Sequence, residues 1–425
     1  MAIDPEELEK RRLAREQQRL RREQEQKAMR RRLIIAGAAL LVALIVIIIC
    51  LVAGGKDEEI PEEETAPAQT AAVLKPTDPD DEETVIRISA AGDLNITDKV
   101  VASCDANFDY MPMIIDVMPL LAEADMTVMN FEGNIGGEPY GTLNSSAPAQ
   151  LLDALATAGV DILQVANSCC IDNGQMGLES TINTIRSVGI EPLGAYASEK
   201  DFQEHGGYTI WEIKGVRIAV VAFTKGMDNT AMPENFEGHV NLLYTDYSSK
   251  YAEVDEEGIT SILKKVKKEK PDVTIAMLHW GSEFNDTHSK SQEKIRTLML
   301  ENGVDAIIGT HPHYVQEIEY SRADGTLVAY SLGDFTSDAD RMGTEYSIVL
   351  NMEITKNNKS GETKITGYSY TPIYIHEEEG SIQVLRIDPA LKAYDENYLD
   401  RVSREVYDAM VNAKQRIEAR IKPSK

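Results

Sequence analysis

Residues 307–316 read IIGTHPHYVQ, an apolar strand that runs directly into two histidines held one residue apart by a proline. A similar apolar run at residues 273–278 ends on His279. Only seven histidines occur in the 425 residues, so three of the seven follow predicted strands. Strands of an open α/β sheet deliver ligand-binding side chains at their carboxyl ends. Because imidazole is a common metal ligand, this placement predicts a metal site.

Around this stretch, apolar strands alternate with amphipathic helical runs. Buried strands are expected at residues 85–91, 126–129, 161–165, 216–223, 273–278, 306–308 and 327–330, with helices near 112–123, 148–158, 177–187, 257–269 and 290–302. Such alternation is typical of an α/β core with largely parallel strands. Residues 345–386 have strand character without intervening helices, which predicts an antiparallel portion. Apolar residues on one face of residues 391–421 predict a long C-terminal helix.

The composition limits the domain count and the partners. The length allows two or three average domains, or one large α/β domain with tails. Hydrophobic residues make up 43% of the chain, which is enough for a sizeable core. The net charge of -27 is unlike that of a nucleic-acid binder, which needs a basic face to neutralise phosphates. We therefore expect no nucleic acid as a partner, and an anionic polymer only where metal ions intervene.

The charge is unevenly distributed along the chain. Residues 1–32 hold eleven Lys/Arg against seven Asp/Glu, and residues 33–53 carry no charge at all. As a helix this uncharged run spans roughly 31 Å, about the thickness of a bilayer core. The remainder holds 32 Lys/Arg against 63 Asp/Glu. The positive-inside rule then predicts a single-pass transmembrane helix with a cytoplasmic N-terminus and the large acidic part extracellular.

Two alternatives to a retained anchor were weighed. A cleaved signal peptide would have a shorter basic region, a shorter apolar run and a small-x-small cleavage site. Lipoprotein processing at Cys50 would require a small residue before it, where the chain has Ile49. We therefore expect a cell-membrane protein with a basic cytoplasmic segment at residues 1–32, a transmembrane helix at 33–53, an acidic disordered stalk at 54–84, an extracellular domain at 85–388 and a C-terminal helix at 389–425.

Six polar side chains stand where predicted strands end: Asp93, Glu132, Asn167, His279, His311 and His313. Two carboxylates, one amide oxygen and three imidazoles suit one or two divalent ions such as Mn, Zn or Fe. A metal ion bound there would generate a hydroxide nucleophile at neutral pH. Taken singly, each residue has an ordinary explanation as a helix cap, a solvated loop acid or a core histidine. Their joint occurrence at successive strand ends favours the metal site.

The strand-end motifs are GD at 92–93, NFE at 130–132, AN at 166–167 followed by Asp172 and Gly174, HWGSE at 279–283, GTHPHYVQ at 309–316 and YSLGDF at 330–335. In this order they resemble the motif series of the CapA capsule-synthesis proteins, whose relatives include the PgsA component of poly-γ-glutamate synthesis. The resemblance covers about residues 85–340, and a membrane anchor before an extracellular domain is also similar to that family. It implies a metallophosphoesterase-like fold, a two-sheet sandwich flanked by helices with a two-metal site between strand-end loops. The six residues named above match the ligands that the resemblance implies, and Asp172 and Glu283 are the remaining candidates for a catalytic group.

The chain departs from the resemblance at two positions. Cys169 stands where the family places a histidine that assists the leaving group, and a thiol cannot donate a proton as imidazolium does. Cys169 could be a soft metal ligand, but without a metal-type cysteine spacing around it we favour a buried small residue. Asp334 stands where relatives usually carry asparagine. A disulfide between Cys169 and Cys170 would be strained, and one bridge to Cys104 is left open.

Two functions from different classes follow from these observations. The first is an extracellular metal-dependent phosphoesterase or transferase that acts on a phosphoester or on a growing anionic polymer. The second is a non-catalytic component that binds polymer or braces a polymer synthase and export complex. The resemblance implies capsule or poly-γ-glutamate production for both. The nearly complete ligand set favours the enzyme and the missing histidine favours the binding component, so whether the chain is an enzyme stays open.

Overall fold

A computed structural model describes residues 82–421, except 105–107, 228–231, 234–235, 237 and 397–401. All of these residues belong to one compact unit, Pro76–Lys425. The predicted transmembrane helix at 33–53 and nearly all of the predicted stalk lie outside the described residues. Within the part that the structure describes, no helix combines the length and the apolar character needed to cross a membrane.

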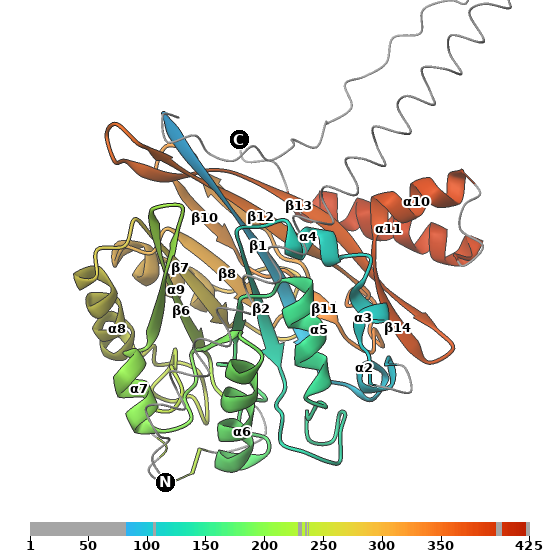
Figure 1. Ribbon diagram of the computed structural model, residues 1–425, viewed down its shortest axis with the longest axis horizontal. Coiled ribbons are helices and arrows are strands. Elements are labelled where there is room, and N and C mark those ends of the chain that lie inside the picture. Colours follow the sequence, from blue (N-terminus) through green and yellow to red (C-terminus); the bar gives the residue numbers. More distant parts are fainter. Residues whose placement is uncertain are drawn as a thin grey trace, which may run out of the picture. The chain divides into compact units, whose positions relative to one another are not determined.

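The first of two sheets is mixed and has eight strands (Figure 1). They are β1 (Glu83–Asn95), β2 (Met126–Glu132), β3 (Ile162–Gln164), β4 (Glu191–Leu193), β11 (Asp334–Thr336), β12 (Tyr346–Asn357), β13 (Thr363–Glu378) and β14 (Ser381–Arg386). Their order is β14–β13–β12–β1–β2–β3–β4, with β11 paired to β1. Strands β1 to β4 and β11 run parallel, whereas β12, β13 and β14 join antiparallel. The antiparallel portion predicted for residues 345–386 is confirmed.

The second sheet has six strands. They are β5 (Tyr208–Ile213), β6 (Val216–Thr224), β7 (Val273–His279), β8 (Ala306–Thr310), β9 (Ile318–Ser321) and β10 (Thr326–Ala329), in the order β5–β6–β7–β8–β10–β9. The four central strands are parallel, and β5 and β9 form antiparallel edges. The carboxyl ends of β6, β7 and β8 therefore meet at one edge of this sheet.

Helices make most of the connections. They are α2 (Asp98–Ala102), α3 (Met111–Ile114), α4 (Met118–Ala122), α5 (Gln150–Ala158), α6 (Gly174–Ser187), α7 (Glu199–His205), α8 (Glu256–Lys268), α9 (Lys290–Glu301), α10 (Ile387–Asp395) and α11 (Arg404–Arg420). The helix predicted near residues 112–123 is two short helices instead. Pro119 lies in the first turn of α4, and in a continuous helix it would lack the N–H that bonds to the preceding turn.

The single long C-terminal helix predicted from residue 389 onward is wrong. The structure has two helices, α10 and α11, and the second begins anew at Ser403, whose side chain accepts a hydrogen bond from the Val406 N–H. The two helices pack on each other, with the rings of Tyr394 and Tyr407 4.7 Å apart. Both lie beside β13 (Figure 1). The apolar periodicity of the sequence was shared between two helices on the same core, so it could not reveal the break.

Side-chain alternation along the strands creates an α/β/β/α arrangement. Ile86 and Ile88 of β1 share one core cluster with Ile275 and Met277 of β7, and this cluster fills the space between the sheets. The outer face of the first sheet packs against α5 and α6, and that of the second against α8 and α9. Figure 1 shows α5 beside β2 and α8 beside β6. The predicted sandwich of two sheets flanked by helices is therefore confirmed.

Candidate metal centre

The inter-sheet faces of two strands lead directly into a polar cluster. On β7, Ile275 and Met277 face the other sheet, and His279 lies two residues further on the same face. On β2, Val128 faces inward in the same way and Glu132 follows four residues later. Strand periodicity thus points both side chains into the space between the sheets. Nε2 of His279 lies 3.4 Å from Oε1 of Glu132, and both side chains are buried.

A β-bulge at Gly92 directs Asp93 to the same place. The register between β1 and β2 shifts between Ala91 and Asp93, so Gly92 is the extra residue. Ala91 packs on the outer face of the sheet, and regular alternation would point Asp93 outward as well. A Cβ at position 92 would lie 1.8 Å from the backbone oxygen of Gly333, so this position accepts only glycine. The bulge turns Asp93 inward, where it is fully buried.

The two histidines after β8 lie in an unusual backbone turn. His311 has a φ of 92° and His313 a φ of 59°, values that residues with a Cβ rarely adopt. Pro312 would normally hold the residue before it in extended backbone. Here the His311 N–H donates a 2.9 Å hydrogen bond to Oδ2 of Asp93, which fixes the turn. Strain of this kind is retained where a functional site requires it.

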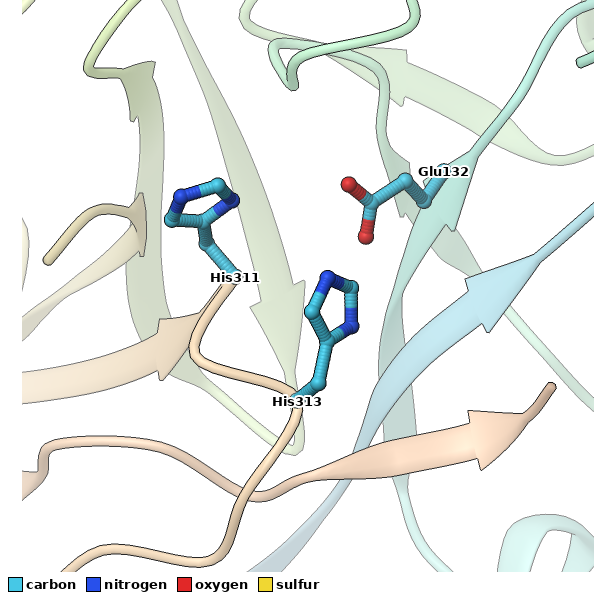
Figure 2. Close-up of side chains that lie close together, drawn as sticks. All are labelled: Glu132, His311 and His313. Atoms are coloured by element: carbon cyan, nitrogen blue, oxygen red, sulfur yellow. The ribbon is translucent and has the colours of Figure 1, made fainter. Parts of the chain in front are cut away.

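Imidazole and carboxylate groups from both sheets converge in this space. Figure 2 shows the rings of His311 and His313 directed toward the carboxylate of Glu132. Ligand atoms of these three residues lie within 4.8 Å of one another. Two further groups satisfy the same limit: Asp93, Glu132 and His279, and Asp93, His313 and Asp334. The structure thus brings together five of the six predicted ligands and adds Asp334.

Three atoms of this cluster have no hydrogen-bond partner among the described residues. They are Oε2 of Glu132, Nε2 of His279 and Nδ1 of His311, all buried. A buried polar atom without a partner costs about 1–3 kcal/mol, and native proteins leave few of them. Divalent cations held by the two ligand groups that contain Glu132, one with His279 and one with His311, would give each of these atoms a partner. The donor set, carboxylate oxygens with imidazole nitrogens, therefore fits a bound metal ion.

The other ring nitrogens of the two histidines are already engaged. Nδ1 of His313 and Oδ1 of Asp334 form a 2.8 Å hydrogen bond, and Asn95 donates to the same oxygen. Nε2 of His311 lies 2.8 Å from Nζ of Lys225, a buried residue directly after β6. This leaves Nδ1 of His311 and Nε2 of His313 to bind an ion, the arrangement in which outer groups orient ligating imidazoles.

Without a bound cation, the ionised forms of the buried Glu132 and Asp93 are unfavourable. Burial, together with the charge of Asp93, raises the pKa of Glu132 well above its usual range. Burial also raises the pKa of Asp93 to about 6. Carboxylates crowded away from water repel one another, and a divalent ion would reverse both effects. The electrostatics of the cluster therefore favour a cation.

The histidines of the cluster divide into two kinds. Burial lowers the pKa of His279 and of His311 well below the usual value, so both rings are neutral and able to bind metal. Burial acts in the same direction on His313, but the carboxylates of Asp334, Glu132 and Asp93 together outweigh it and hold the pKa of His313 well above its usual range. In the metal-free protein His313 therefore carries a positive charge.

Two amides support the cluster. The buried Asn167, a predicted ligand, donates from Nδ2 to the Phe131 carbonyl at 2.6 Å, and its Oδ1 accepts from the Cys169 N–H at 3.1 Å. Asn130 donates to Oδ1 of Asp93 at 2.6 Å and lies 3.4 Å from Nδ1 of His279. Asn130 was not singled out from the sequence, although the alternation that identifies Glu132 applies to it equally.

The two catalytic candidates lie at different places. Glu283 is at the rim: its Oε1 is 4.0 Å from Nε2 of His313, and its side chain is 46% exposed. Asp172 belongs to none of the three ligand groups, and its Oδ2 accepts a hydrogen bond from the Ser145 hydroxyl at 2.9 Å. The structure therefore offers Glu283 as the candidate nearer the cluster.

The cysteines near the site are free thiols. Cys104, Cys169 and Cys170 form no disulfide, so the bridge left open by the sequence is not made. Burial raises the pKa of Cys169 well above its usual range, and the charge of Glu132 adds to this effect. The thiol of Cys169 therefore stays protonated near neutral pH, which disfavours a thiolate ligand. Its side chain is only partly buried, whereas the sequence predicted a buried residue.

The fold is an α/β sandwich with a cluster of possible metal ligands between its sheets. The sequence profile of the bacterial capsule synthesis protein PGA_cap family matches residues 87–339, which include all six predicted ligands. This chain belongs to that family. The resemblance inferred from the strand-end motifs is thereby confirmed.

Two characterised relatives come from Bacillus. The chain is 26% identical over 248 residues to the capsule biosynthesis protein CapA of Bacillus anthracis, covering 57% of each chain. It is 26% identical over 283 residues to the PGA biosynthesis protein CapA of Bacillus subtilis, covering 64% of this chain and 66% of that protein. The match thus spans less than two thirds of either relative.

Among solved structures, the calcineurin-like phosphoesterase YfkN of Bacillus subtilis has a TM-score of 0.42 at 16% identity, covering 79% of this chain and 98% of that one. A phosphatase of Mycoplasma pneumoniae also has a TM-score of 0.42, at 11% identity, covering 70% and 96%. These similarities are distant, and the fold described above rests on strand order and register instead.

Proposed function

We propose that this protein takes part in making or exporting an anionic capsule polymer such as poly-γ-glutamate, and that its strand-end cluster holds one or two divalent metal ions. Membership of the capsule synthesis family supports the first part. The single observation that carries the second is the set of three buried, unpaired ligand atoms on Glu132, His279 and His311. Imidazole and carboxylate together suit Mn, Zn or Fe.

A divalent ion held in the cluster would supply Lewis acidity toward an oxygen of the substrate. Asp334 would orient His313, and Asn130 would orient Asp93, through the hydrogen bonds that they form with these two ligands. The walls of the two sheets exclude water from His279 and Asp93, which are fully buried. An ion held in this way would attract an anionic group of a polymer.

Polymer binding is favoured over turnover by the state of Cys169. Its protonated, uncharged thiol cannot serve as a cationic proton donor to a leaving group. Extracellular phosphoesterase activity on a metallophosphoesterase-like fold is the second candidate, and the completeness of the ligand set favours it. Hydrolysis of a phosphodiester such as bis(p-nitrophenyl) phosphate by the metal-loaded protein separates them: a binding component gives none, and an enzyme gives turnover that His311→Ala abolishes.

We further propose that residues 33–53 anchor the chain in the cell membrane and that the domain after the stalk is extracellular, beside a polymer synthase or export complex. The uncharged run and the basic residues before it support this proposal. Protease treatment of intact cells tests it. Digestion of the acidic domain with protection of residues 1–32 is expected, and full protection of both would contradict an extracellular domain.

The role in polymer production is tested in the producing cells. Replacing the chromosomal copy by His311→Ala should lower surface polymer to the level of a deletion strain. The matched control is His205→Gln, a half-exposed histidine on α7 away from the cluster. An unchanged amount of surface polymer in the deletion strain would contradict the proposed role in polymer production. A reduced amount in the deletion strain with an unchanged amount in His311→Ala would show that this role does not depend on the metal centre.

A further inference from the structure

A cavity of about 400 Å³ lies between α11 and the loops next to the cluster of candidate metal ligands. Tyr314 and Val315, which directly follow His313, form one wall, and Arg416 and Arg420 of α11 form another. Cavities of this size admit a ligand as large as an amino-acid residue. Helix α11 lies beyond residue 339, so the family match does not account for this wall.

The two arginines of the cavity differ in their partners. They lie one turn apart on the same face of α11, and Ile417 between them is buried and fixes the helix on the core. Arg420 forms an ion pair with Asp286 across the cavity. No ion pair links Arg416 to any carboxylate within the described part of the chain. Its Nη2 lies 3.6 Å from the sulfur of Met342, a weak acceptor, and its guanidinium also bonds to the hydroxyl of Tyr346.

The cavity and the metal cluster share two loops. His313 and Tyr314 are consecutive, so the turn after β8 sends one side chain to the cluster and the next to the cavity. The loop after β7 does the same: Glu283 lies 4.0 Å from His313, whereas Asp286 lines the cavity. A chain of repeated charged units could therefore reach both places at once.

We propose that this cavity is a binding subsite for a free carboxylate of an acidic, peptide-like polymer, and that Arg416 receives the carboxylate. The inference rests on the proposed function, and it assigns a carboxylate ligand to a second binding site next to the metal centre. A guanidinium matches a carboxylate with two parallel hydrogen bonds. Val315, Ile417 and Met342 supply apolar surface for the methylene groups that lie in the main chain of a γ-linked glutamate polymer beside each carboxylate, which a bare phosphate lacks.

The test measures binding of a fluorescently labelled γ-linked glutamate oligomer to the full chain by anisotropy, with a chelator present so that no metal contributes. Arg416→Gln is expected to weaken binding on the order of tenfold, the effect of about 1.4 kcal/mol. Arg416→Lys keeps the positive charge but lacks the two parallel N–H donors of a guanidinium. Its affinity for the oligomer should lie between those of Arg416→Gln and the parent chain. The matched control is Arg404→Gln, which removes another exposed positive charge from the same helix.

Each outcome decides the inference. A loss of affinity for the oligomer in Arg416→Gln but not in Arg404→Gln, with thermal unfolding unchanged, supports the proposed subsite. Equal affinities of Arg416→Gln and Arg404→Gln overturn it, and so does the absence of binding to the parent chain. Inorganic polyphosphate that binds through Arg416 when the oligomer does not would overturn the carboxylate assignment. None of these failures touches the proposed function, which the polymer content of His311→Ala cells tests separately.

Discussion

Asp93 and Asp334 lie opposite each other on the adjacent parallel strands β1 and β11, and both face Nδ1 of His313. Oδ1 of Asp334 is 2.8 Å from this nitrogen, and Oδ2 of Asp93 is 3.9 Å from it. Two carboxylates on one imidazole favour its protonated form. The two carboxylates thus stabilise the protonated ring of His313. This ring must lose a proton before it can bind a metal ion through Nε2.

Metal binding should therefore release protons, and Asp334→Asn should reduce the number. The pKa of His313 is held well above its usual range by Asp334, so the ring is protonated near pH 7. Replacing the carboxylate lowers this pKa, and about one proton fewer should be displaced. Calorimetric titration with Zn²⁺ in two buffers of different ionisation enthalpy counts the protons. Equal release by both proteins would contradict the role of Asp334.

The same groups set the pH dependence of metal affinity. Protons compete with the ion for His313, whose pKa is raised, and for Asp93, whose pKa is about 6. Affinity should therefore fall as the pH decreases toward neutrality, and more steeply below about pH 6, where Asp93 is protonated as well. Apparent dissociation constants across this range check the sign. Affinity that rises on acidification would be inconsistent with ligation by these two residues.

Gly92→Ala should damage both stability and the site. The new Cβ would lie 1.8 Å from the Gly333 oxygen, so β1 and β11 must separate. We expect a loss of about 3 kcal/mol in the free energy of unfolding by urea, together with loss of metal. Gly367→Ala on β13 is the control: its Cβ meets nothing within 4 Å, and a change within about 0.5 kcal/mol is expected. Similar stabilities for the two variants would contradict the bulge as the cause.

Cys169→Ser should leave the metal content unchanged. The thiol is protonated near neutral pH because burial raises its pKa, so it offers no thiolate to an ion. Serine keeps the size and removes the sulfur. The measurement is the zinc content of the two proteins after identical loading with Zn²⁺. A loss of bound zinc in Cys169→Ser would indicate that Cys169 is a metal ligand.

The strand-end rule predicted much of the site because it depends on short local patterns. His279 and Glu132 each end an apolar run, and strand alternation alone then points them between the sheets. The same rule also applies to β6, which ends directly before Lys225, so the position of this lysine at the cluster is equally predictable from the sequence.

Other parts of the site depend on contacts between distant segments. Gly92 becomes a bulge only because β11 crosses next to it, more than 200 residues later in the chain, and nothing local to position 92 shows this. The partnership of Asp334 with His313 likewise requires the parallel pairing of β1 and β11. The break between α10 and α11 escaped prediction because both helices keep apolar residues on one core.

The most direct test is the metal content of the purified full chain, measured by plasma mass spectrometry after exposure to Mn²⁺, Zn²⁺ and Fe²⁺ and removal of free ions. The account predicts about one or two ions of one kind per chain. His311→Ala should lose nearly all of this metal and His205→Gln should retain it. Absence of metal from the parent chain under all three conditions, or equal metal in His311→Ala, would contradict the metal centre.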